Sequence, residues 1–101
     1  MTSRESYRDA LLPHLAATFR ELREEQRFSL RQMAAALTES PGHERLARGS
    51  SIASLHSNLS RVERAEYWPR DPDAWVAAYA TATGRRPADV WVMVIKRWEG
   101  R

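Results

Sequence analysis

The sequence has no cysteine, only four glycines and a single lysine among its 101 residues. Without cysteine the chain can form neither a disulfide framework nor a thiolate zinc site. Its longest apolar run, Val90–Ile95, falls far short of the roughly 20 residues that a membrane-spanning helix needs. The first ten residues are polar and contain no apolar signal region. We therefore expect a soluble, cytoplasmic domain with no membrane association.

Arginine supplies fifteen of the sixteen basic residues, and the formal net charge is +3. Arginine has a planar fork of donors that suits phosphates and guanine edges, which lysine lacks. Codon usage in a GC-rich genome would give the same bias, so the composition permits nucleic-acid binding without requiring it. The positive excess is largest in residues 29–64, which hold five arginines and three acidic residues, whereas residues 1–28 are neutral.

Few helix breakers and abundant alanine, leucine, arginine and glutamate predict one all-α domain over residues 1–101, without repeats or linkers. Apolar residues at three- and four-residue spacing predict a first helix over about residues 7–26. We expect Pro13 to break or restart this helix, because proline lacks the backbone N–H that the helix interior needs. Residues 1–14 are assigned to an N-terminal extension of the domain.

The middle of the chain predicts two helices separated by a long loop. Ser29 and Gln32 have the spacing of a capping box that opens a short helix, Leu30–Leu37. Residues 39–50 contain proline and glycine and predict an inserted loop, with one weak turn at 44–47. The next helix runs from about residue 51 to 65. Four apolar residues form its predicted buried seam: Ile52, Leu55, Leu59 and Val62. Small, polar and basic residues form its outer face: Ala53, Ser54, Ser57, Asn58, Arg61 and Arg64.

Two further helices complete the predicted fold. The triplet Asp71-Pro72-Asp73 places an N-cap, a first-turn proline and a helix-dipole acid in the order that opens a helix. Gly84 ends that helix, and Pro87 begins the last one, which continues to about Trp98. The sequence therefore predicts five helices, with an unusually long connection between the second and the third.

Several of these segments resemble the lambda-repressor-like, xenobiotic-response-element type of helix-turn-helix domain. The first helix ends in the run Leu22-Arg23-Glu24-Glu25, and the second opens with Phe28, Ser29 and the pair Met33-Ala34. The third ends in Leu59-Ser60-Arg61-Val62-Glu63-Arg64, with Ala65 where the family usually has glycine. The resemblance covers about residues 15–94. One departure is large: over a dozen extra residues separate the second and third helices, which the family joins by a tight turn.

The resemblance implies that the helix over residues 51–65 reads base edges in the major groove of double-stranded DNA. The expected base contacts are Ser54, His56, Ser57, Asn58 and Arg61. Arg61 has the donors for a bidentate contact with guanine. The serines and Arg61 are equally compatible with an ordinary solvated helix face.

The resemblance also implies a set of contacts with the DNA backbone. Residues at the start of the second helix, in the inserted loop and after the recognition helix are the candidates for phosphate binding: Ser29, Arg31, Gln32, Arg45, Arg48, Arg64, Tyr67 and Arg70. Helix N-termini present backbone N–H groups that suit phosphates. Arg23 and Glu63 are expected to form a structural ion pair between the first and third helices, since the family often pairs these positions.

The sequence gives no support for a cofactor, a small-molecule ligand, a metal site or an enzyme. The three histidines are far apart, and neither a nucleophile turn nor a glycine-rich phosphate loop is present. We expect a nucleoid-associated prokaryotic or phage regulator, most simply a repressor. It is expected to form a homodimer through the last helix near Val92, Met93 and Ile95, or else to bury Val92 and Met93 under residues 1–14 as a monomer. A protein-interaction module that uses the inserted loop, and a DNA-bending architectural factor, are the alternatives.

Overall fold

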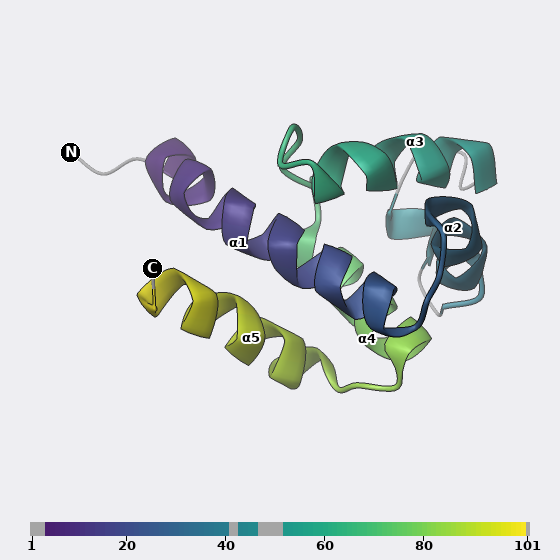
Figure 1. Cartoon of the computed structure of the whole chain (residues 1–101). Helices are drawn as coiled ribbons and strands as arrows, with labels where there is room; N and C mark the ends of the chain where they lie inside the picture. The colour runs from purple at the N-terminus through teal and green to yellow at the C-terminus, as the bar shows by residue number, and fades with distance from the viewer. Residues whose placement is uncertain (1–3, 41–42, 47–51, 101) are drawn as a thin grey trace.

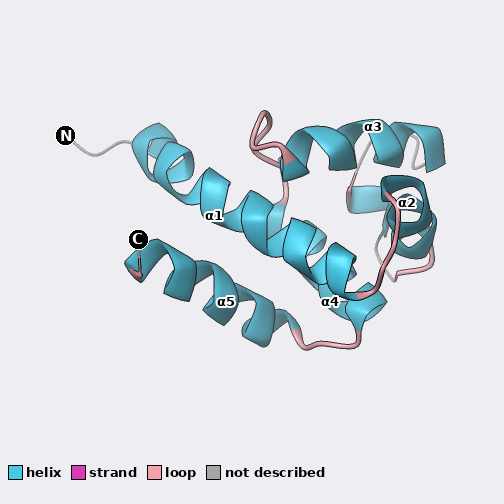
Figure 2. Ribbon diagram, in the orientation of Figure 1, coloured by secondary structure: helices cyan, strands magenta, loops and turns pink. Residues whose placement is uncertain are grey.

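The computed structural model describes residues 4–40, 43–46 and 52–100, and over these ranges it contains helices and no strand (Figures 1 and 2). The elements in chain order are α1 (Arg4–Glu25), α2 (Leu30–Thr38), the 3-10 turn η1 (His43–Arg45), α3 (Ile52–Glu63), α4 (Pro72–Thr83) and α5 (Pro87–Glu99). The predicted all-α fold of five helices is confirmed. Within these ranges no helix combines the length and the apolar character that crossing a membrane requires.

Helix α1 lies in the middle of the molecule and contacts α3, α4 and α5 (Figure 1). Its apolar stripe is buried, and Phe19 stacks on Tyr79 of α4 with ring centroids 4.0 Å apart. Trp75 and Val76 of α4 are also buried in this core. Large apolar side chains from all five helices thus share one core, which fixes the relative positions of the helices.

Pro13 does not interrupt α1, so the predicted break is wrong. Proline removes the hydrogen bond to the carbonyl of Asp9, but Pro13 and Asp9 both lie on the exposed side of the helix, where water can hydrate that carbonyl. Leu11 and Leu15, on the opposite side, are buried in the core and hold the helix on both sides of the proline. Residues 4–14 are therefore the first turns of α1.

Three of the helices end with a residue in the left-handed backbone conformation. Arg27 follows α1, Ala65 follows α3 and Gly84 follows α4, with φ values of 58°, 59° and 71°. At the end of α3 the N–H of Glu66 donates to the carbonyl of Arg61 at 2.9 Å, which is the long hydrogen bond of a Schellman motif. Only α4 ends with the glycine that this conformation favours. The motif turns the chain back toward α3 after its last residue.

The first part of the insertion is packed against the bundle. Leu46 is buried in the core, and η1 contacts α2 and α4. The guanidinium of Arg45 pairs with the carboxylate of Asp71, whose other oxygen caps α4 by accepting a hydrogen bond from the Ala74 N–H at 3.1 Å. The turn predicted at 44–47 is thus found at His43–Arg45. Residues 47–51 lie outside the described part, as does the predicted cap of α3.

Candidate nucleic-acid interface

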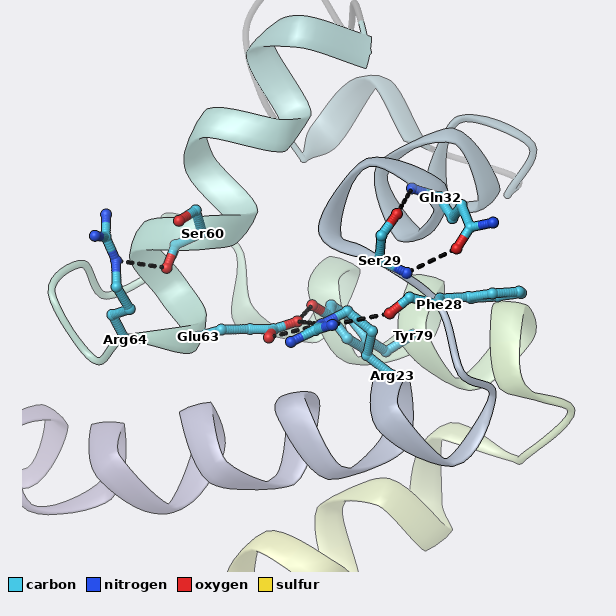
Figure 3. A network of polar contacts seen from close by, with 8 residues as sticks. All are labelled: Arg23, Phe28, Ser29, Gln32, Ser60, Glu63, Arg64 and Tyr79. Carbon is cyan, nitrogen blue, oxygen red and sulfur yellow. Dashed lines mark hydrogen bonds and ion pairs between the residues drawn. The ribbon is translucent and has the colours of Figure 1, made fainter.

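Helix α2 opens with the capping box that its sequence predicts (Figure 3). The hydroxyl of Ser29 accepts a hydrogen bond from the Gln32 N–H at 3.1 Å, and the Ser29 N–H donates to the Gln32 side-chain oxygen at 2.8 Å. These reciprocal bonds satisfy two N–H groups of the first turn. The two polar side chains predicted to bind phosphate therefore also fix the start of α2.

Helix α3 crosses α2 and is held by an apolar inner face (Figure 1). Leu55, Leu59 and Val62 are completely buried, as the predicted seam requires. The side chain of Ile52, the fourth predicted member, is outside the described set. The inner face of α3 therefore fixes the rotation of the helix, and with it the side chains that point outward.

A buried polar network holds the C-terminal end of α3 (Figure 3). The Nε of Arg23 donates to Glu63 Oε1 and Oε2 at 2.9 and 3.0 Å, and the hydroxyl of Tyr79 donates to Oε2 at 2.7 Å. A second nitrogen of Arg23, Nη1, donates to the carbonyl of Phe28 at 2.8 Å. The Arg23–Glu63 ion pair implied by the resemblance is present. The network around it connects α1, α3 and α4 with Phe28, the residue before the Ser29 cap of α2.

Tyr79 is a member of this network to which the sequence analysis assigned no polar role. Burial raises the pKa of its hydroxyl well above the usual range, and the neighbouring charge of Glu63 raises that pKa further. Tyr79 thus remains a neutral donor for the carboxylate. A tyrosine on an otherwise apolar helix face was the available signal, because a buried phenol needs a hydrogen-bond partner.

The residues predicted to contact bases lie on two parts of α3. Ser57 and Arg61 are exposed on the outward face, whereas Ser54, His56 and Asn58 are half-buried toward its sides. Arg61 does not extend freely into solvent: its Cζ lies 5.6 Å from the ring centroid of Tyr67, in the loop after α3. The outward face therefore has small residues toward its start and an arginine near its end.

The predicted phosphate contacts are more widely spread. Arg31 on α2 and Arg70 after α3 are exposed, as is Arg64, whose Nε donates to the Ser60 carbonyl at 3.3 Å (Figure 3). Arg45 pairs with Asp71 at the start of α4, and its side chain is 63% exposed. Arg48 lies outside the described residues. Exposed arginines from the predicted set therefore lie on α2, in η1 and around the end of α3.

Among the described residues, no cluster of three or more histidine, aspartate or glutamate side chains could hold a metal ion. What this surface offers chemically is hydrogen-bond donors and positive charge. No protein-family model, no curated protein and no solved structure matches the chain. The interpretation of the site therefore depends on its own geometry.

Proposed function

We propose that this protein is a sequence-specific regulator of transcription that binds double-stranded DNA and reads its major groove with α3. The supporting observation is the contrast between the two faces of α3. Its inner face is fixed by Leu55, Leu59 and Val62, whereas Ser57 and Arg61 are exposed on its outer face. A recognition helix needs both properties, since base contacts require rigid positioning and accessible polar groups. The proposed fold is a lambda-repressor-like helix-turn-helix bundle.

The shape of the outer face suits the groove. The major groove is about 12 Å wide and admits one α-helix. Ala53 and Ser57 are small and exposed, so the backbone of α3 can approach the base edges closely. Arg61, one turn beyond Ser57, can then donate two hydrogen bonds to O6 and N7 of a guanine. The half-buried Ser54, His56 and Asn58 would contact bases only from the sides of the helix.

Backbone contacts would set the register of α3 on the duplex. Arg31 in the first turn of α2, and Arg64 and Arg70 at and beyond the end of α3, are exposed and positively charged. Charge-assisted hydrogen bonds to phosphate hold a protein in position without reading sequence. These contacts would make binding depend on salt, because each neutralised phosphate releases counterions.

The proposal includes a two-fold homodimer on an inverted repeat, as in a simple prokaryotic or phage repressor. We place the contact between the copies on α5, where Val92 is the large apolar side chain that stays 50% exposed in the described part of the chain. Met93 and Ile95 beside it are half-buried. A protein that is monomeric at micromolar concentration and binds single half-sites would contradict this part of the proposal.

The test begins with selection of duplexes from a random-sequence pool, followed by competition binding of the selected duplex and a scrambled duplex. We expect a preference of about 10³ or more for the selected sequence, and its reduction in Arg61→Ala. Arg86→Ala is the matched control, since Arg86 is an exposed arginine before α5 and is not among the residues proposed to contact DNA. Equal, salt-sensitive binding of both duplexes would favour an architectural factor. No binding would favour a protein-interaction module. Either result would overturn the proposal.

A further inference from the structure

Arg61 and Tyr67 meet because the chain reverses at the end of α3. The Glu66 N–H donates to the Arg61 carbonyl at 2.9 Å, and Ala65 takes the left-handed conformation that this bond requires. The next residue, Tyr67, is thereby brought beside the Arg61 side chain, with 5.6 Å between the guanidinium carbon and the ring centroid. This distance is within the range of a cation–π contact.

The two arginines at the end of α3 are held in different ways. Arg64 uses the edge of its guanidinium: Nε donates to the Ser60 carbonyl at 3.3 Å, and Nη2 lies 3.5 Å from a carboxylate oxygen of Glu66. The Cζ of Arg61 lies 5.6 Å from the ring centroid of Tyr67, and no hydrogen bond is part of this contact. In the described part of the chain no carboxylate pairs with it. The edge donors of Arg61, which a guanine would need, therefore remain available.

We propose that Tyr67 is a positioning residue for Arg61 and acts through it to increase discrimination at one base pair. A cation–π contact uses the positive charge of the guanidinium and does not consume a particular N–H donor, so it can exist together with a hydrogen-bonded base contact. The ring also restricts the rotamers of Arg61 before DNA binds, and so reduces the entropy lost in forming the base contact. This inference depends on the proposed function, and it replaces the phosphate contact expected for Tyr67 from the sequence.

The test compares Tyr67→Leu with Tyr67→Phe. Selection with the unaltered protein and with Arg61→Ala identifies the base pair at which preference depends on Arg61. Competition anisotropy then measures, for each variant, the affinity ratio between the selected duplex and one altered at that base pair. We expect Tyr67→Leu to reduce the ratio about two- to fivefold, which is the size of an exposed cation–π contact. Tyr67→Phe keeps the ring and should keep the ratio.

Two controls separate positioning from other roles. Arg64→Ala should weaken binding to all duplexes alike and leave the ratio unchanged, because phosphate contacts carry no sequence information. In the free protein, the ring of Tyr67 should shift the side-chain proton resonances of Arg61 upfield, and this shift should vanish in Tyr67→Leu and persist in Tyr67→Phe. Equal melting temperatures for the two Tyr67 variants show that both are folded.

Three results would overturn the inference while leaving the proposed function intact. The first is an unchanged ratio in Tyr67→Leu. The second is an equal loss of affinity for every duplex in Tyr67→Phe, which would make the hydroxyl a phosphate contact. The third is a selected motif in which no base pair depends on Arg61. If the unaltered protein selects no motif, the proposed function itself fails, and the inference fails with it.

Discussion

The charged side chains on the inner and outer faces of α3 differ in burial and in pairing. On the inner face Glu63 is only 4% exposed and accepts hydrogen bonds from Arg23 and Tyr79, so its charge is compensated within the fold. On the outer face Arg61 and Arg64 are exposed. Substitutions on the inner face should therefore change stability first, and substitutions on the outer face should change DNA binding alone.

The largest expected effect is on the inner face. Arg23→Met leaves the buried Glu63 carboxylate without its cation, and loss of one partner of a buried pair costs about 3–5 kcal/mol. Urea denaturation should show this decrease in the free energy of unfolding. The double variant Arg23→Met with Glu63→Gln removes the unpaired charge and keeps an acceptor for Tyr79, so it should recover part of the loss. A double variant less stable than Arg23→Met alone would contradict this explanation.

The next effect is on the outer face. Arg61→Ala should lower the affinity for the selected duplex by about 1–3 kcal/mol, the usual contribution of a bidentate contact to base discrimination. Its free energy of unfolding should change by less than about 1 kcal/mol, because the contact with Tyr67 that it loses is an exposed cation–π contact. Anisotropy and urea denaturation measure the two quantities on one sample. A large loss of stability would mean that the two faces are not separate.

Alkaline pH should lower the free energy of unfolding through Tyr79, in the network on the inner face of α3. The unfolded chain releases the Tyr79 proton near pH 10, whereas the raised pKa in the native state keeps that proton bound. Above about pH 10 the unfolded state therefore binds fewer protons than the native state, and stability should fall by up to about 1.4 kcal/mol per pH unit. Below pH 10 this group adds no slope.

Tyr79→Phe is the control for that slope. It removes the titrating group, so its stability should vary less with pH above 10 than that of the unaltered protein. Chemical denaturation at several pH values between 8 and 11 compares the two proteins. Parallel curves would show that Tyr79 does not cause the dependence.

The smallest effect lies just beyond the end of α3. Ala65 has a φ of 59°, a conformation that is unfavourable for residues with a Cβ. Ala65→Gly should increase the free energy of unfolding by about 0.5–1 kcal/mol, because the relief of strain exceeds the greater entropy of glycine in the unfolded chain. Thermal unfolding measures the change. A decrease in stability would show that the conformation at Ala65 is not strained.

The sequence predicted the helices well where capping and apolar spacing act locally. The capping box at Ser29, the start at Asp71 and the end at Gly84 are all confirmed. Pro13 misled the prediction because the effect of proline depends on which side of the helix it occupies, and burial is decided by the whole fold. The Arg23–Glu63 pair was implied by the family resemblance and by no local pattern, since 40 residues separate its members.

The contacts of the outer face were less predictable. The contact between Arg61 and Tyr67 depends on the left-handed backbone conformation at Ala65. A glycine at this position would have indicated that conformation, whereas alanine does not. The ion pair of Arg45 with Asp71 depends on how the insertion packs against α4. Both contacts form between segments whose relative placement is a result of folding, so no spacing in the sequence indicates them.

The most direct test of the central claim is the affinity ratio between a selected duplex and a scrambled duplex of equal length. It should be measured by fluorescence anisotropy at several salt concentrations. If α3 reads the major groove, the ratio should be about 10³ or more near physiological salt and should fall in Arg61→Ala. Affinity for both duplexes should decrease as salt rises. A ratio near one, unchanged in Arg61→Ala, would contradict the claim that the outer face of α3 reads DNA sequence.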